Sequence, residues 1–385
     1  MKSIPFTECV DLVGSRCKPF KGTKKYVSTG AVDVDQINEA GIEIIDYEKR
    51  PSRANLEASL GDVLFAKMQG TKKTLLISSS LVENIYSTGF CAVKAKENVL
   101  TERCLYHLLT SKMFLEQKDK NCSGATQKAI TNKGLQKVIL HVPDINKQDL
   151  IAAQLDLIVK IITLRKQELV ELDDLIKARF VELFGNPLDG TAKYPIHQVG
   201  EVANSVDPQP SHRTPPIDED GIPYVSTKDC DYKTGKIDFE GARKVSRGVL
   251  EEHLNRYTLH DGDFIIGKIG TIGKPVFVPA REDYTLSANV VLVQPNSDLV
   301  SPYFLKYSFE SDFVERQFAE AKNSTSQAAF GIQKVRTVKV MNPNLNIQRG
   351  FEDFVKQIDK SKATVQKALD ETQLLFDSLM QQYFG

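Results

Sequence analysis

Two stretches that lie 200 residues apart decide the fold: residues 155–185 read LDLIVKIITLRKQELVELDDLIKARFVELFG, and residues 355–385 read VKQIDKSKATVQKALDETQLLFDSLMQQYFG. Both place apolar residues at alternating steps of three and four, the heptad pattern of a helix with one buried seam. The apolar seam positions are Leu155, Ile158, Ile162, Leu169, Leu172, Ile176, Val355, Ile358, Val365, Leu369, Phe376 and Leu379. Each stretch predicts a helix of about 33 residues, roughly 50 Å long at 1.5 Å per residue.

Such seams must be buried against another surface. We expect the two helices to pack on each other in antiparallel orientation, in the manner of a coiled coil. Four polar residues, Arg165, Arg179, Lys362 and Thr372, interrupt the seams, and we expect them to set the register. The alternative is a pair of separate helices, each lying on its own globule.

The repeat extends well beyond the helices. Residues 87–185 align with residues 287–385 without a gap, and 18 of the 99 aligned positions are identical. Upstream, Gly61-Asp62 corresponds to Gly262-Asp263, and Tyr26–Thr29 corresponds to Tyr224–Thr227. The chain is therefore read as two copies of one unit, residues 1–185 and 186–385, and a unit of this size can bury its own core.

Ahead of each helix, the sequence predicts a mixed globule of short strands and few helices. Strands are expected at 61–66, 262–267, 290–293 and 335–340, and helices at about 101–118 and 301–320. The predicted fold class is α+β: two pseudo-symmetric mixed α/β domains separated by two long antiparallel helices. The expected domains are residues 1–144, 145–185, 186–344 and 345–385.

Composition indicates a folded, non-secreted protein. The 385 residues carry 50 basic and 50 acidic side chains, but residues 1–144 have a net charge of +5 and residues 186–344 one of −3. No apolar stretch is long enough to span a bilayer, and no secretory signal is visible. The six cysteines form no CxxC pair, so we expect reduced thiols and a cytoplasmic location.

Catalytic signatures are missing from the sequence. The glycine-rich run Lys268–Lys274 does not have the spacing of a phosphate-binding P-loop. The sequence contains neither an HExxH zinc motif nor a GxSxG nucleophile motif, and no methyltransferase Asn/Asp-Pro-Pro-Tyr/Phe signature. We therefore expect no metal site, no cofactor and no catalysis in this chain.

The duplicated order of motifs resembles the specificity subunit of type I restriction-modification systems, over essentially the whole chain. The resemblance rests on the strand and glycine loop at Gly61–Lys67 and Gly262–Lys274, and on a Gly/Ser-x-x-Gln segment at Gly124–Gln127 and Ser324–Gln327. It also rests on the Pro-to-Gln entry into each helix, at Pro143–Gln148 and Pro343–Gln348.

The resemblance implies a non-catalytic DNA reader. Each globule would be a target-recognition domain that reads one half of a bipartite, gapped sequence in double-stranded DNA. The helices would set the gap and dock two methyltransferase subunits, which would bring S-adenosylmethionine for adenine methylation. Restriction subunits using ATP and magnesium would join the complex in the bacterial or archaeal cytoplasm.

Base reading requires Arg or Lys for guanine and Asn or Gln for adenine, and phosphate contacts require local cations. The candidate DNA-binding residues are Arg16, Lys18, Lys67, Gln69, Lys72, Lys73, Gln127, Lys128, Lys133, Arg243, Lys244, Lys268, Thr271, Lys274, Ser326, Gln327 and Lys334. Gln127 and Gln327 occur in both copies, which also fits a structural role. The rival reading of the chain is a coiled-coil adaptor with two protein-binding heads and no role on DNA.

Overall fold

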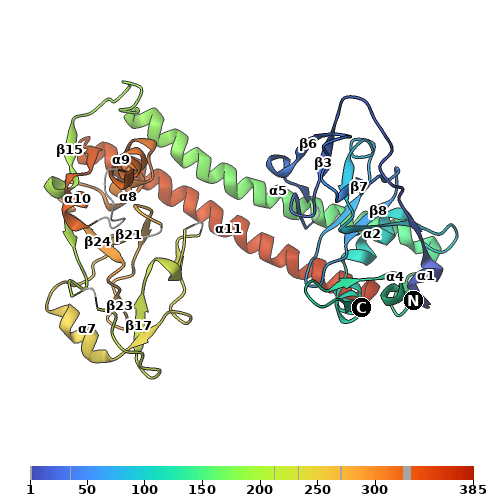
Figure 1. Cartoon of the computed structure of the whole chain (residues 1–385). Helices are drawn as coiled ribbons and strands as arrows, with labels where there is room; N and C mark the ends of the chain where they lie inside the picture. Colours follow the sequence, from blue (N-terminus) through green and yellow to red (C-terminus); the bar gives the residue numbers. More distant parts are fainter. Residues whose placement is uncertain (1, 35, 212, 233, 269–270, 324–330) are drawn as a thin grey trace. The chain divides into compact units, whose positions relative to one another are not determined.

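The computed structural model describes residues 2–385 except residues 35, 212, 233, 269–270 and 324–330. The chain forms two compact units. Unit 1 comprises residues 1–167 together with 366–385, and unit 2 comprises residues 168–365. Both ends of the chain therefore belong to unit 1 (Figure 1). The long helices α5 (Ile145–Phe184) and α11 (Leu345–Phe384) each contribute residues to both units.

Unit 1 is built from short strands with helices against them. Its strands are β1 (Lys2–Pro5), β2 (Val10–Val13), β3 (Thr23–Val27), β4 (Val32–Asp33), β5 (Gln36–Ile37), β6 (Glu43–Asp46), β7 (Ala54–Leu56), β8 (Val63–Ala66), β9 (Thr74–Leu76), β10 (Ile85–Ser87), β11 (Phe90–Ala95), β12 (Cys122–Ser123), β13 (Ala129–Ile130) and β14 (Ile139–Val142). Its helices besides α5 and α11 are α1 (Phe6–Cys9), the 3₁₀ turn η1 (Glu39–Gly41), α2 (Glu102–Thr110), α3 (Lys112–Lys120) and α4 (Asn132–Leu135).

Unit 2 repeats this plan. Its strands are β15 (Ile196–Gln198), β16 (Ala203–Val206), β17 (Ile222–Val225), β18 (Cys230–Asp231), β19 (Lys236–Ile237), β20 (Lys244–Val245), β21 (Phe264–Gly267), β22 (Pro275–Phe277), β23 (Thr285–Leu286), β24 (Val290–Pro295) and β25 (Lys339–Met341). Its remaining helices are α6 (Val199–Val202), the 3₁₀ turn η2 (Thr227–Asp229), α7 (Arg247–Leu254), α8 (Pro302–Phe309), α9 (Asp312–Asn323) and α10 (Ile332–Thr337).

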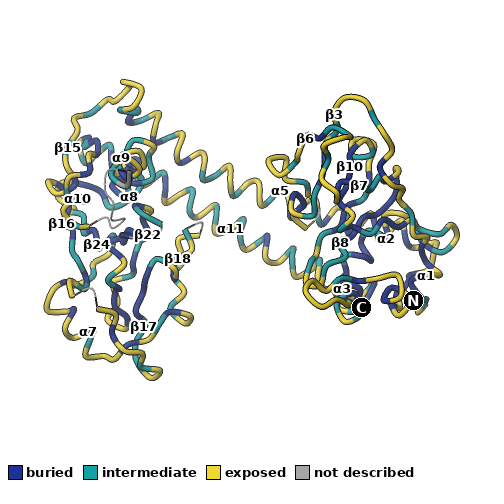
Figure 2. Tube along the Cα trace, viewed as in Figure 1, coloured by how far each residue is buried: buried dark blue, intermediate teal, exposed yellow. Residues whose placement is uncertain are grey.

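The sheets of the two units have matching topology. An antiparallel sheet of order β2-β11-β8-β9 in unit 1 corresponds to β16-β24-β21-β22 in unit 2. Each unit also has one parallel pair, β3 with β10 and β17 with β23. Strands β8 and β21 are buried at every position, as their continuous apolar runs predict (Figure 2). The predicted α+β class and the pseudo-symmetry of the two copies are confirmed.

The two long helices run antiparallel within each unit. In unit 1, the Tyr383 hydroxyl donates to Gln154 Oε1 at 3.1 Å, and Arg165 reaches Thr372 and the Ala368 carbonyl. In unit 2, Lys362 Nζ lies 2.5 Å from Asp173 Oδ1. As the residue numbers on α5 increase, those of the contacting residues on α11 decrease. The predicted antiparallel orientation of the two helices is therefore confirmed. Of the four polar residues expected to set the register, Arg165, Thr372 and Lys362 pair between the helices, whereas Arg179 pairs with Glu182 on its own helix.

The end of each helix completes the core of the opposite copy. Phe184 ends the helix of the first copy, yet its ring lies 4.7 Å from that of Phe304 and 5.6 Å from that of Phe351, in unit 2. Phe384 ends the helix of the second copy and is buried in unit 1 in a cluster with Ile151 and Leu155. The heptad seam therefore continues directly into two hydrophobic cores.

Identical residues in the repeat make identical bonds. The amide oxygen of Gln148 accepts from the Thr101 backbone N–H at 2.8 Å, and that of Gln348 accepts from the Ser301 N–H at 2.7 Å. Both glutamines are fully buried, and both donate to the carbonyl of the proline that precedes the helix. Because a buried amide must be paired, this glutamine fixes where each long helix leaves its globule.

Four sequence predictions about secondary structure need correction. The helix expected at 101–118 is two helices, α2 and α3, because Ser111 is extended and its hydroxyl caps α3 by accepting from the Phe114 N–H at 3.2 Å. Likewise, α8 and α9 replace the single helix expected at 301–320. The strand expected at 335–340 begins only at Lys339, since α10 extends to Thr337.

The fourth correction concerns the length of the long helices, which have 40 residues each rather than about 33. They begin ten residues before the first seam position. Asp144 caps α5, with its carboxylate accepting from the Asn146 N–H at 3.0 Å, and Asn344 caps α11 in the same way through the Ile347 N–H. The heptad pattern alone could not show this first part of each helix, where the globule shares in the burial.

Candidate nucleic-acid interface

In both units, the glycine-loop strand ends beside the parallel strand pair. Lys67 follows β8 and donates its backbone N–H to the Gly89 carbonyl at 2.9 Å. Lys268 follows β21 and donates to the Asn289 carbonyl at 2.9 Å. Gly89 and Asn289 lie just beyond β10 and β23, the second strands of the parallel pairs. The same backbone frame thus presents the start of both predicted DNA-reading loops.

The loop of unit 1 is a tight turn from Met68 to Thr71. The Thr71 backbone N–H donates to the Met68 carbonyl at 3.4 Å, and Gly70 has a φ of +76°, which the third position of a type II turn requires. Gln69 donates its backbone N–H to the Lys128 carbonyl at 2.9 Å. The turn is therefore attached to the β12–β13 hairpin, which carries the second predicted DNA-binding segment.

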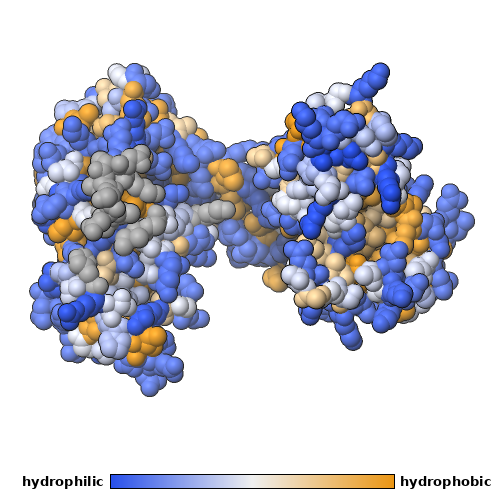
Figure 3. Space-filling view, in the orientation of Figure 1, coloured by the Kyte–Doolittle hydropathy of each residue, from blue (hydrophilic) through white to orange (hydrophobic). Residues whose placement is uncertain are grey.

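The structure thus brings together two segments that the sequence singled out separately. Five of the candidates here have exposed side chains: Gln69, Lys72, Gln127, Lys128 and Lys133. Lys67 and Lys73 are half-buried, and Lys73 Nζ donates to the Thr29 carbonyl at 2.8 Å. We call these seven residues the unit 1 basic loop surface. Figure 3 shows that hydrophilic side chains cover much of the visible face of this unit.

Arg16 and Lys18 lie elsewhere in unit 1, on the segment between β2 and β3. Both are exposed, and the Lys18 backbone N–H donates to Glu57 Oε1 at 3.2 Å. Within the described residues, neither shares a hydrogen bond or an ion pair with the basic loop surface. They form a second group of exposed cations in unit 1.

In unit 2, the candidate cations differ in accessibility. Lys268 is only 4% exposed, and its Nζ lies 2.7 Å from Asp207 Oδ1. It is thus a buried, ion-paired residue and not the open loop cation that we expected. Lys274 is exposed, whereas Thr271 and Lys334 are half-buried. Ser326 and Gln327 lie outside the described residues.

Arg243 and Lys244 bind the loop that precedes β17. Arg243 donates to the Pro215 carbonyl at 2.5 Å, and Lys244 Nζ donates to the Glu219 carbonyl at 3.2 Å. Lys244 is exposed, and Arg243 is half-buried. The guanidinium of Arg243 is thus held in place, which leaves Lys244 as the more accessible of the two cations.

Sequence reasoning missed residues at the ends of the parallel pairs and one buried lysine. Thr29 accepts from Lys73, and Thr227 packs against Gly267, so the repeated Tyr-Val-Ser-Thr segments border both loops. Their repetition was the signal that could have indicated them. Lys118 is fully buried beneath the turn of unit 1. Nothing in the repeat could have indicated it, since residue 318 is Phe.

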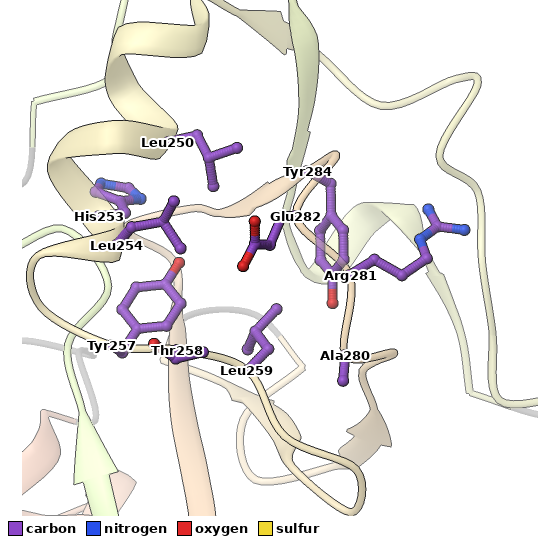
Figure 4. Close-up of a pocket in the computed structure, with 10 residues that line it drawn as sticks. All are labelled: Leu250, His253, Leu254, Tyr257, Thr258, Leu259, Ala280, Arg281, Glu282 and Tyr284. Carbon is purple, nitrogen blue, oxygen red and sulfur yellow. The ribbon is translucent and has the colours of Figure 1, made fainter.

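A small cavity of about 70 Å³ lies in unit 2 between α7 and the segment that leads into β23 (Figure 4). His253 and Tyr257 line it, and the Thr285 hydroxyl joins them, 2.6 Å from His253 Nδ1 and 3.1 Å from the Tyr257 oxygen. Burial lowers the pKa of His253 and raises that of Tyr257. The cavity has room for roughly two water molecules, far too little for a nucleotide.

The helix seams are buried where the heptad pattern places them. Leu155, Ile158, Ile162, Ile176, Val355 and Leu369 are buried, and Leu169, Leu172, Ile358, Val365, Phe376 and Leu379 are half-buried. None of these twelve side chains is exposed, which leaves the outer faces of the helices for any partner.

The described part of the chain contains neither a candidate metal site nor a candidate membrane-spanning helix. No group of three or more His, Cys, Asp or Glu side chains there could hold a metal ion. Nor does any helix among those residues combine the length and apolarity that crossing a bilayer requires. Burial raises the pKa of Cys9 to about 11 and that of Cys104 to about 12, so these thiols are inert packing residues.

Comparisons with known proteins agree with the duplicated fold. A family model described as the type I restriction modification DNA specificity domain matches residues 15–174 and again residues 213–372. The chain is 20% identical over 323 residues to the type I restriction enzyme EcoBI specificity subunit of Escherichia coli, covering 76% of this chain and 67% of that relative. A putative type I restriction enzyme MjaX specificity subunit of Methanocaldococcus jannaschii is 23% identical over 172 residues, covering 43% and 40%.

Two solved structures share the fold. One was described for the complex assembly and conformational transition of the type I R-M system, with a TM-score of 0.59, 19% identity, and coverage of 99% of this chain and 97% of that chain. The other is the S subunit of the type I restriction-modification system from M. genitalium, with a TM-score of 0.58, 14% identity, and coverage of 100% and 96%.

A duplicated α+β unit with one long helix per copy defines a class of paired modules. The two matches of the family model span most of the chain, and the chain belongs to the type I restriction-modification DNA specificity family. The rival reading, a coiled-coil adaptor without a DNA role, finds no support in these comparisons.

Proposed function

We propose that this chain is the non-catalytic DNA-reading subunit of a type I restriction-modification complex. Each globule reads one half of a bipartite target, and α5 and α11 fix the gap between the halves. The observation that carries this proposal is the family match in both copies, together with the same loop frame at Lys67 and Lys268.

The basic loop surface has the chemistry that DNA recognition requires. Exposed Lys72, Lys128 and Lys133 supply cations for phosphates, and exposed Gln69 and Gln127 supply amides of the kind that pair with adenine. The cations are local, so a chain with no net charge still offers a positive loop. Because these cations are few, we expect the isolated chain to bind DNA weakly and the methyltransferase subunits to add most of the affinity.

The partners follow from the same proposal. Two methyltransferase subunits would dock on the helices and bring S-adenosylmethionine, and restriction subunits with ATP and magnesium would join them. The pseudo-symmetry of the two copies would let two identical subunits bind in equivalent ways. The complex would act in the cytoplasm of a bacterium or archaeon.

The experiment is selection from random duplexes. The chain is mixed with its methyltransferase partner and a pool of random double-stranded DNA, and bound duplexes are recovered by gel shift and sequenced. We expect enrichment of one gapped, two-part sequence. Recovery of duplexes without any shared sequence, with and without the partner, would contradict the proposal. The methyltransferase alone is the control, because it should enrich no sequence.

A further inference from the structure

Lys118 is a lysine with no exposed surface. It lies in the last turn of α3, and its side chain points beneath the turn from Met68 to Thr71. Its ammonium group donates to the Met68 carbonyl at 2.9 Å and to the Thr71 carbonyl at 3.0 Å, and it lies 3.0 Å from Asp119 Oδ1. The ammonium group therefore makes two hydrogen bonds to the turn and one ion pair with the neighbouring carboxylate. A buried lysine is rare, and this one is satisfied almost entirely by the turn.

Asp119 holds the tip of the same turn. Its Oδ2 accepts from the Gly70 backbone N–H at 3.1 Å, and its backbone carbonyl accepts from Gln69 Nε2 at 3.3 Å. Together with Lys118, it binds the turn at both ends and at the tip. The hairpin adds one further bond, from the Gln69 N–H to the Lys128 carbonyl. The turn is therefore a rigid feature, although its tip is exposed.

The second copy supports its loop with different chemistry. At the positions 200 residues later, unit 2 has Phe318 and Ala319 instead of a lysine and an aspartate. Phe318 is buried, and Gly273 sits so close to its ring that an added Cβ would lie 2.5 Å away. The residue just before is the same in both copies, since Gln117 and Gln317 make the same pair of bonds to the backbone of Ile139 and Lys339.

The contrast separates two functions within one helix. The glutamine joins α3 or α9 to the last strand of the globule and is the same in both copies. The next residue along the chain touches the DNA-reading loop and differs.

We propose that Lys118 and Asp119 are positioning residues that determine the specificity of the first recognition domain. They hold the Met68–Thr71 turn in one conformation, so that Gln69 at its tip and Lys72 beside it meet the DNA in a fixed geometry. This inference rests on the proposed function. It adds that one half of the target is set by a buried lysine and aspartate beneath the loop, and the other half by a different support.

The test uses the intact complex. The chain and its methyltransferase partner are expressed in a host without a modification system, and methylated sites are mapped across the host genome. Two variants address the inference. Lys118→Met removes the three polar contacts of the lysine but keeps the side-chain length. Asp119→Ala removes the bond to the Gly70 N–H at the tip of the turn, and it does so at a partly exposed position. Asp119→Ala decides the matter if Lys118→Met fails to fold.

Lys96→Met is the matched control. Lys96 Nζ also donates to a backbone carbonyl, that of Thr7 at 2.8 Å, but it follows β11 at the end away from Gly89 and Lys67. The half-site of the first domain is identified as the half that persists when residues 191–343 are exchanged for those of another family member.

We expect Lys118→Met and Asp119→Ala to lower discrimination at one or more bases of that half-site by at least tenfold. The other half-site and the gap should stay unchanged, and Lys96→Met should keep the full target. A purely structural role would reduce the amount of methylation at an unaltered target. Unchanged discrimination in both variants, with a bipartite target for the parent chain, would overturn this inference alone. The lack of any bipartite target for the parent chain would overturn the proposed function as well.

Discussion

Replacing Phe384 by alanine tests the exchange of helix ends between the copies. Phe384 has no exposed surface and packs in unit 1 with Met380, Ile151 and Leu155. Truncation of a fully buried phenylalanine costs about 3–5 kcal/mol, because the lost transfer energy adds to that of the cavity left behind. We expect this loss to fall on unit 1, although Phe384 belongs to the second copy of the repeat.

The assay is amide hydrogen exchange, read separately for the peptides of each unit, because a single unfolding midpoint is not defined for a chain of two units. Protection should fall in the strands and helices of residues 1–155 and remain in residues 190–340. Leu374→Ala is the control, since this leucine lies on the same helix with 70% of its surface exposed and should change stability by less than about 0.5 kcal/mol. Equal loss in both units, or a loss in unit 2 alone, would refute the exchange.

Three further predictions concern buried bonds, pH and charge. Gln148→Leu leaves the Thr101 N–H without its partner, and we expect it to lower the free energy of unfolding of unit 1 by about 1–3 kcal/mol. Urea unfolding followed in unit 1 measures this loss. No change in the free energy would show that the helix exit does not depend on this bond. Burial lowers the pKa of His107 against the opposing effect of Asp156, so the stability is intact above about pH 6.5 and falls as pH drops from there through the lower folded-state pKa. Urea unfolding at several pH values should show that His107→Gln loses this acid sensitivity, and an unaltered pH dependence would contradict it. Alanine at Lys72 and Lys128 should each reduce the slope of log affinity against log salt by about 0.9 in the methyltransferase-bound complex, and an unchanged slope would exclude phosphate contact.

The large-scale fold could be predicted because its signals are periodic. A heptad seam determines which face of α5 and α11 is buried. The repeat at an offset of 200 residues shows the same sequence pattern twice in one chain. Register was also accessible, since Arg165 and Lys362 stand out in apolar seams and do pair across the helices. Helix boundaries were less accessible: Ser111 reads equally well within a helix and as a cap, and only the observed break shows which applies.

The candidate interface could be predicted only in part. The loops after β8 and β21 follow Gly-Asp turns, and their positions were readable from the sequence. The solvent exposure of their lysines was not readable, because it depends on which distant residue each lysine contacts in the fold. Lys268 meets Asp207 and becomes buried, whereas Lys72 stays exposed. The burial of Lys118 could not be predicted either, since a lysine is expected on a surface. The carbonyls that accept its hydrogen bonds lie about 50 residues earlier in the chain.

The central claim is that two recognition modules in one chain read two halves of one DNA target. Methylome mapping of cells that express the chain with its methyltransferase partner tests it most directly. We expect methylated adenines within a single motif of two specified halves separated by a gap of fixed length and unspecified sequence. We also expect that a residue insertion in α5 near Lys160–Arg165 changes the gap and leaves both halves intact. A contiguous motif, or an insertion that alters the half-sites instead of the gap, would contradict it.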